Sequence, residues 1–182
     1  MTEPFTNPTG RNSIAFLFHP SAVPVIDVFR SIGSLDDQYD LALLDGPERG
    51  LAPYAQPGAA KGIVSDALLL AFALTRQRGR PFDHRPLRSR CGTLDEYCLL
   101  SLIGASRQPG SEVAREASAL LGISPQELLS SLVGELARHI DLGVIVFPVP
   151  TLREFRAAAG IESGQMEAIV EASNKPGRYF GL

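Results

Sequence analysis

The sequence lacks the short motifs that identify the common enzyme classes. It contains no glycine-rich phosphate loop, no Gly-x-Ser-x-Gly nucleophile elbow and no His-Glu-x-x-His zinc motif. Cysteine is scarce as well, with only Cys91 and Cys98 in 182 residues. A chain of this length can bury a core without disulfides, so both cysteines are expected to be reduced thiols of a cytoplasmic protein. An active site assembled from dispersed residues stays open.

Long hydrophobic runs are also absent. The longest, Ala67–Leu74, follows Asp66 and precedes Arg76, and it falls far short of the roughly 20 residues of a membrane helix. It predicts a buried core helix over residues 65–77. The first apolar run, Ile14–Phe18, is too short for the core of a signal peptide. We therefore expect a cytoplasmic protein that does not span a membrane.

The charges are unevenly distributed along the chain. The net charge is −3, but residues 61–110 carry eight basic and four acidic side chains, while both flanking regions are acidic. The connector 76–90 contains a glycine and two prolines, which exclude a continuous helix. Its arginines are either exposed loop charges or contacts for an anion or nucleic acid, since guanidinium suits phosphate. They are Arg76, Arg78, Arg80, Arg85, Arg88 and Arg90.

Three consecutive helices are predicted between residues 93 and 140. Thr93 with Glu96, and Ser124 with Glu127, form capping boxes that satisfy free N–H groups of the first helical turn. Ser111 is expected to cap the helix between them, which ends at the glycine 122. The last of the three has the clearest apolar stripe, made of Leu128, Leu132, Leu136 and Ile140 and joined by Leu129 and Val133.

Elements are predicted on both sides of these helices. Residues 1–12 read as a loose arm. Residues 13–45 read as a small unit of strand 14–18, helix 23–32 and strand 39–44. The connector 46–62 is rich in glycine, proline and alanine and predicts irregular structure at a boundary. The body 63–182 should add a third strand at 144–147, a helix capped by Thr151 and Glu154 that stops at Gly160, and a last helix over 163–173.

The fold class that follows is α+β and predominantly α-helical. A small N-terminal strand–helix–strand unit precedes a body of about five or six helices, and the two parts can form one domain.

One stretch resembles a helix-turn-helix motif. In the segment 114–132, the turn Leu121-Gly122-Ile123 separates two helices, as in many DNA-binding proteins. The second helix, however, begins with Ser124, Gln126 and Glu127 instead of the basic side chains that contact phosphates. A packed pair of helices is therefore favoured over DNA recognition.

A metal site is the other candidate. His84, Cys91 and Cys98 carry suitable ligand atoms for zinc, but the cysteines are seven residues apart and a fourth ligand is missing. Cys98 also falls within an apolar helix, where a buried thiol is the usual finding. We expect no cofactor, and we expect His19 and His139 to be structural or surface residues.

Three functions follow, in order of preference. The first is a non-enzymatic interaction or regulatory protein that acts through a helical scaffold, binding itself as a homodimer and another protein. The second is a DNA-binding transcriptional regulator that uses the segment 114–132. The third is an enzyme with a dispersed active site. Because acidic regions flank the arginines, we expect no nucleic-acid binding at physiological salt.

Overall fold

The computed structural model describes residues 15–33, 44–124, 127–146 and 148–161. The fold is predominantly helical with one small antiparallel sheet, which confirms the predicted class. No helix in the described ranges is both long and apolar enough to cross a membrane. The described part contains seven α-helices: α1 (Val23–Gly33), α2 (Asp45–Leu51), α3 (Ala59–Arg78), α4 (Leu94–Ala105), α5 (Glu112–Leu121), α6 (Glu127–Leu142) and α7 (Leu152–Ala159).

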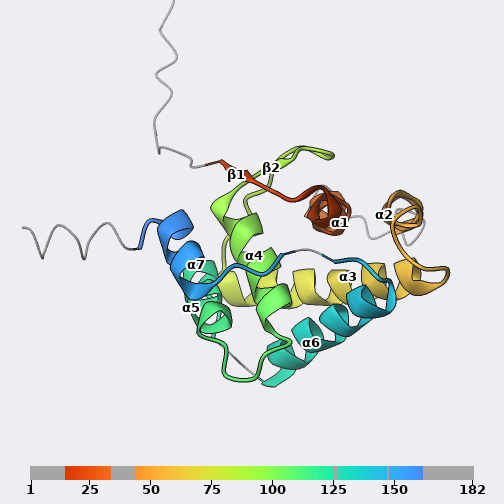
Figure 1. The fold of residues 1–182 in the computed structure, drawn as a ribbon. Helices are drawn as coiled ribbons and strands as arrows, with labels where there is room; N and C mark the ends of the chain where they lie inside the picture. The colour runs from red at the N-terminus through yellow and green to blue at the C-terminus, as the bar shows by residue number, and fades with distance from the viewer. Residues whose placement is uncertain (1–14, 34–43, 125–126, 147, 162–182) are drawn as a thin grey trace, which may run out of the picture.

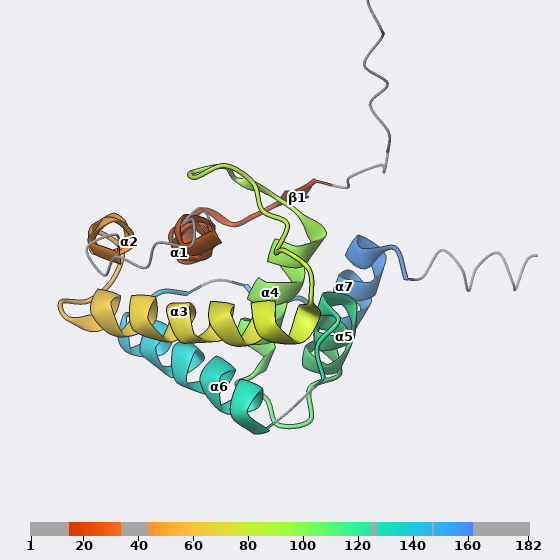
Figure 2. The same ribbon diagram turned by 180° about the vertical axis from the view of Figure 1, so that it is seen from behind.

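Helix α3 lies across the middle of the molecule (Figure 1). Helices α1 and α2 pack on one side of it and α6 on the other, and the view from behind shows the same order (Figure 2). Helix α4 packs against α5 and α6, and α7 contacts α5. Buried side chains from the N-terminal and C-terminal helices, such as Ile26, Leu70, Leu99, Leu136 and Phe155, belong to one hydrophobic cluster. The N-terminal helices therefore share the core of the helical body.

The predicted first strand is present but short. β1 (Phe16–Leu17) pairs antiparallel with β2 (Cys91–Gly92), with Phe16 opposite Gly92. Its partner thus comes from the far end of the arginine-rich connector. Of the strand predicted at 39–44, residues 39–43 lie outside the described residues, and the last residue leads into α2.

The prediction of irregular structure at 46–62 is wrong. This segment contains most of α2 and the first turn of α3. Pro47 is tolerated because it lies in the first turn of α2, where a backbone N–H has no acceptor within the helix. Leu51 is buried in the core. Gly58 adopts a left-handed conformation (φ 84°) just before α3, which begins six residues earlier than predicted.

The local cap signals were reliable where they can be checked. Both halves of the capping box are present at Thr93 and Glu96 and at Thr151 and Glu154. The predicted caps of α5, a serine at 111 and a left-handed glycine at 122, are confirmed too. The box expected at Ser124 depends on residues 125–126, which lie outside the described residues, as does the helix predicted at 163–173.

The predicted apolar stripe of α6 is buried except at Leu128, which is exposed, and Leu132, which is half-buried. Leu128 is 67% exposed, whereas Leu129 is buried and continues through Val133, Leu136 and Ile140. Successive residues of a helix differ by about 100°, so the neighbour of a buried residue can face solvent. This buried row faces α3, against which α6 packs.

The predicted third strand at 144–146 is also absent from the described residues, and its last residue, 147, lies outside them. Val144 has a left-handed conformation (φ 58°). The N–H groups of residues 143, 144 and 145 donate to carbonyls of the last turns of α6, at His139, Asp141 and Ile140 respectively. The backbone is therefore used to end the helix and is not available for a sheet.

Candidate functional site

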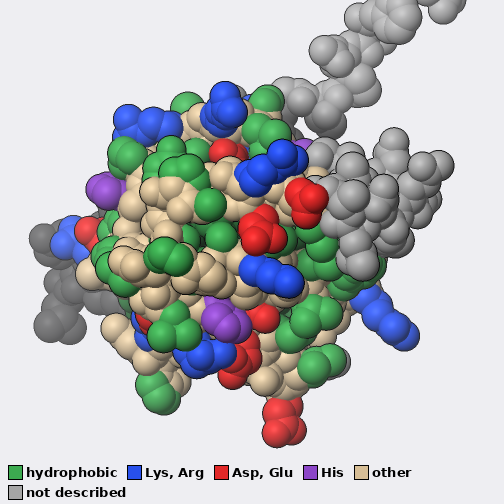
Figure 3. Space-filling model, turned by 90° about the vertical axis from the view of Figure 1, so that its right-hand side faces the viewer, with side chains coloured by type: hydrophobic (Ala, Val, Ile, Leu, Met, Phe, Trp, Pro, Cys, Tyr) green, Lys and Arg blue, Asp and Glu red, His purple; other side chains and the backbone are tan. Residues whose placement is uncertain are grey.

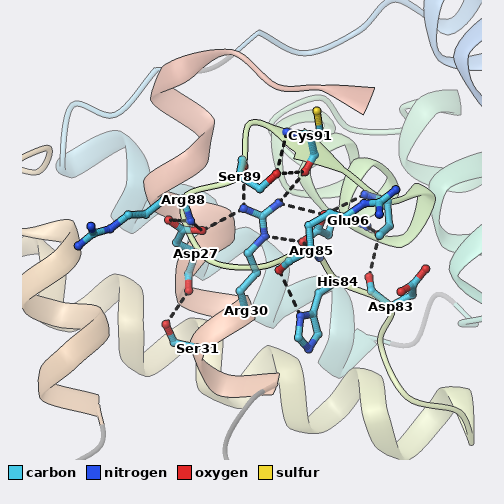
Figure 4. A network of polar contacts seen from close by, with 11 residues as sticks. Asp27, Arg30, Ser31, Asp83, His84, Arg85, Arg88, Ser89, Cys91 and Glu96 are labelled. Atoms are coloured by element: carbon cyan, nitrogen blue, oxygen red, sulfur yellow. Dashed lines mark hydrogen bonds and ion pairs between the residues drawn. The ribbon is translucent and has the colours of Figure 1, made fainter. Parts of the chain in front are cut away.

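A buried arginine ties α1 to the connector and to α4 (Figure 4). The side chain of Arg30 is only 1% exposed. Its Nε and Nη2 donate to the two carboxylate oxygens of Glu96, at 2.6 and 3.1 Å. Nη1 donates to Asp27 and to the carbonyl of Ser89, and Nη2 donates again to the carbonyl of Cys91. These five hydrogen bonds use all five N–H donors of the guanidinium group.

The Glu96 carboxylate, which accepts two of these bonds, also has hydrogen-bond donors for each of its oxygens. Besides Arg30, the Glu96 carboxylate accepts from the backbone N–H of Thr93 at 2.9 Å and of Arg85 at 3.1 Å. Burial alone lowers the pKa of Arg30, but its hydrogen bonds and charge interaction with Glu96 raise it, so that the pKa lies above its usual value. The pair has no free donor or acceptor with which to exchange a proton, so its role is structural.

Two more carboxylates hold the connector. Asp27 accepts the backbone N–H of Arg88 with both oxygens, at 3.0 Å each. Asp95 accepts from Arg78, from both terminal nitrogens of Arg80 at 3.0 Å, and from the backbone of Asp83. Burial raises the pKa of Asp95, but the hydrogen bonds from the two arginines lower it by more, so its pKa lies below the usual value. The connector is therefore fastened along its length.

The predicted arginine cluster is consequently divided. Arg78 and Arg80 pair with Asp95, and the backbone of Arg85 is bound to Glu96. Arg76, the first residue of the connector, is exposed in the last turn of α3 and does not line either cavity described here. The last two predicted arginines, Arg88 and Arg90, line a groove together.

This groove, which we call the arginine groove, has a volume of about 920 Å³ and lies between α1, α2 and the end of the connector. Arg88 and Arg90 line it from the connector, and Arg49 lines it from α2. Tyr54 and Leu87, both mostly exposed, add apolar surface. Its remaining lining residues are small, apolar or proline, except for Asp27: Pro20, Val23, Pro24, Val28, Ser31, Gly46, Pro47, Gly50 and Pro53.

The positive charge in the arginine groove is only partly compensated. No ion pair joins Arg49, Arg88 or Arg90 to a carboxylate in the described part of the chain; Arg49 donates only to the carbonyl of Asp45, and Arg90 only weakly, at 3.4 Å, to a carbonyl. The one carboxylate in the groove, Asp27, is already engaged by Arg30. Because Arg30 also pairs with Glu96, Asp27 still offsets one of the three positive charges, and the groove keeps an excess of positive charge.

The backbone at Arg88 is held in an uncommon conformation. Its φ of 63° lies in the left-handed region, which costs a non-glycine residue roughly 1–2 kcal/mol. The two bonds from its N–H to Asp27 hold this conformation. The side chain of Arg88 points away from the Arg30 cluster (Figure 4). Strain of this kind is concentrated at functional sites.

The metal candidates are not brought together. Within the described ranges, no three His, Cys, Asp or Glu side chains are grouped so that they could hold a metal ion. Cys91 is exposed, whereas Cys98 is buried in α4. Desolvation by burial raises the pKa of the Cys98 thiol to about 12, so it stays protonated and is a poor metal ligand.

The helix-turn-helix-like segment contributes mainly to the core. Helix α5 packs against α4, and α6 against α3 and α4. Leu121 and Ile123 are buried at the turn, and the described residues of the first turn of α6 expose Glu127 and Leu128. Neither offers a positive charge to a phosphate, so phosphate contacts would have to come from elsewhere on the surface.

One histidine has a partner suited to acid–base chemistry. Nδ1 of His139 lies 2.5 Å from Oδ2 of Asp66, and its Nε2 lies 3.2 Å from Nη2 of Arg138. Gly62 packs against the ring, since a Cβ there would come within 3.0 Å. The two ring nitrogens are thus engaged, and His139 lines neither of the cavities described here. This arrangement joins α3 to α6.

Sequence reasoning missed Arg30, Glu96 and Arg49 as members of these sites. A signal existed for the first: Arg30 follows Ile26 by four residues and so lies on the apolar face of α1. No comparable signal exists for Arg49, because its position depends on how α2 packs.

Comparison of the chain with protein-family models, with curated proteins and with solved structures found no match.

Proposed function

We propose that this protein is a non-enzymatic interaction protein that binds an acidic segment of a partner protein in the arginine groove. The observation that carries the proposal is the convergence of Arg49, Arg88 and Arg90, none of which has a carboxylate partner in the described residues, on one groove. Positive charge that is not neutralised within the protein favours an anionic partner.

The apolar lining favours a peptide over a simple anion. Tyr54 is 61% exposed beside the arginines, and tyrosine and arginine are enriched at the energetic centres of protein interfaces. The other exposed apolar residue, Leu87, and the prolines of α1 and α2 offer rigid contact surface. An acidic segment with interspersed apolar residues matches both features.

Duplex DNA fits the same surface less well. A specific complex buries about 1,000–2,500 Å² of protein and requires a row of phosphate contacts. On the face drawn in Figure 3, acidic side chains lie between the basic ones, so that this face shows no continuous basic area. The arginine groove is more suitable for a short peptide.

The test is the binding of a fluorescein-labelled peptide, Glu-Glu-Leu-Glu-Glu-Leu-Glu-Glu, measured by fluorescence anisotropy. We expect binding that weakens about tenfold or more in the double variant Arg88→Ala/Arg90→Ala, since an arginine at the energetic centre of an interface contributes about 2 kcal/mol or more and a tenfold change is about 1.4 kcal/mol. The matched control is Arg76→Ala/Arg153→Ala, which removes the same charge from exposed positions outside the groove. It should change the affinity less than twofold.

Two results would contradict the proposal. Equal weakening by both double variants would show that only net charge matters. Tighter binding of a labelled DNA duplex than of the peptide, with a log–log salt slope of about −0.9 per contact, would favour the DNA-binding regulator.

We also propose that the protein forms a homodimer. The support is an exposed apolar stretch at the end of α6, formed by Leu142, Val144 and Val146. Sedimentation equilibrium should give twice the chain mass of 19.5 kDa, and Val144→Asp with Val146→Asp should give the single mass. A monomer in the unmodified protein would refute this part.

A further inference from the structure

A second cavity shares no lining residue with the arginine groove. It has a volume of about 510 Å³, within the range of small-molecule sites. The end of α1 contributes Phe29 and Ile32, α3 contributes Phe72, and the connector contributes Phe82. We call it the aromatic cavity. Its walls suit an apolar molecule.

One charged residue of the aromatic cavity lacks acceptors for its donors. The side chain of Arg78 is only 1% exposed, and its Nη2 donates to Asp95. Its Nε and Nη1 are buried and have no hydrogen-bond partner in the part of the chain that the structure describes. Such unsatisfied buried donors are rare in proteins and call for an explanation, a ligand being one.

The charge balance beside the cavity is positive. Arg78 and Arg80 share the single carboxylate of Asp95, so one positive charge is left over. Asp83, the other acidic residue of this stretch, is exposed and does not line the cavity. His84 lines the cavity and adds no negative charge. An anionic group would restore the balance.

We propose that the aromatic cavity binds a small carboxylic acid with an apolar body, whose carboxylate accepts a hydrogen bond from Arg78. The apolar body lies among Phe29, Ile32 and Phe72. The ring of Phe82 lies over the guanidinium, with its centroid 5.2 Å from Cζ, and shifts when the carboxylate reaches the nitrogen atoms. This site is separate from the peptide-binding groove and does not depend on it.

The experiment is isothermal titration calorimetry of the full chain with 3-phenylpropionate and octanoate, and with the amide of each acid. Hydrogen bonds to charged groups are stronger than neutral ones, so we expect the amides to bind about ten- to a hundredfold more weakly than the acids. In Arg78→Met, which keeps the length of the side chain, this preference for the acid should disappear.

A cavity-filling variant keeps the test decisive if Arg78→Met does not fold. Ala71 lines the cavity, so Ala71→Phe should abolish binding while every charge is retained. The matched control is Ala119→Phe, at an exposed position of α5 outside the cavity, which should bind as the unmodified chain does. The groove variant Arg88→Ala/Arg90→Ala should bind the acids normally as well.

Three outcomes would overturn the inference. They are the absence of binding by both acids, equal affinity for an acid and its amide, and unchanged binding by Ala71→Phe.

Discussion

The substitution Glu96→Gln tests the central ion pair most directly. Each oxygen of the Glu96 carboxylate accepts two N–H groups, one from Arg30 and one from the backbone of Thr93 or Arg85. A glutamine amide has only one oxygen. In either orientation its NH₂ group would therefore face two donors, and the buried charge of Arg30 would keep only Asp27 as a charged partner.

The magnitude follows from the burial of both partners. Removing one member of a buried, hydrogen-bonded ion pair costs about 3–5 kcal/mol. For a chain of this size each kcal/mol lowers Tm by about 2–4 °C, so the expected decrease is roughly 6–20 °C. Urea denaturation followed by circular dichroism at 222 nm would measure the free energy of unfolding directly.

The chain provides its own control. Glu154 occupies the same position in the second complete capping box but is solvent-exposed and pairs with no arginine in the described residues. Glu154→Gln should therefore destabilise the protein much less than Glu96→Gln. Equal losses of unfolding free energy in the two variants would refute the reasoning, because they would show that Glu96 stabilises the protein only as a helix cap and that its ion pair with Arg30 adds nothing.

Four further predictions concern the thiols, the core and the small sheet. Native protein should react with iodoacetamide at Cys91 only, as peptide mass mapping would show. The pKa of the Cys98 thiol is raised from 9.0 to about 12 in the folded protein, so the unfolded chain loses this proton at lower pH. The urea concentration at the midpoint of unfolding should therefore fall as the pH rises from about 9 towards 12. Leu136→Ala should cost about 2–5 kcal/mol in urea denaturation, while Leu128→Ala should change little because that side chain is exposed. Gly92→Ala should destabilise the protein by about 1–3 kcal/mol or more, since a Cβ there would lie 2.1 Å from the phenyl ring that follows β1; an unchanged Tm would contradict this close approach.

The parts of the fold that the sequence predicted are those decided by nearby residues. The boxes at Thr93 and Thr151 involve residues only three positions apart, and both are present. In the stripe of α6 the prediction is wrong at Leu128, because Leu128 and Leu129 are both leucine and only the packing of α6 decides which one is buried. Local patterns carry no such information.

The sites depend on pairs that are distant in sequence. Glu96 was explained in the sequence by its cap alone, yet it also binds Arg30, 66 residues earlier. The six connector arginines look alike in the sequence, but Asp95 engages two of them, and Arg88 and Arg90 reach the arginine groove. Which arginine remains available is decided by tertiary structure.

The Arg30 cluster also has a consequence for the order of folding. Its acceptors come from α1, the connector and the start of α4, so the guanidinium can be desolvated without penalty only after all three have assembled. Bringing together residues that are 66 positions apart costs loop-closure entropy, and an incomplete set of acceptors stabilises little in return. The cluster should therefore form late, after the main barrier to folding. It then acts chiefly on the rate of unfolding, so that it determines how long the folded protein persists and has little effect on how fast it folds.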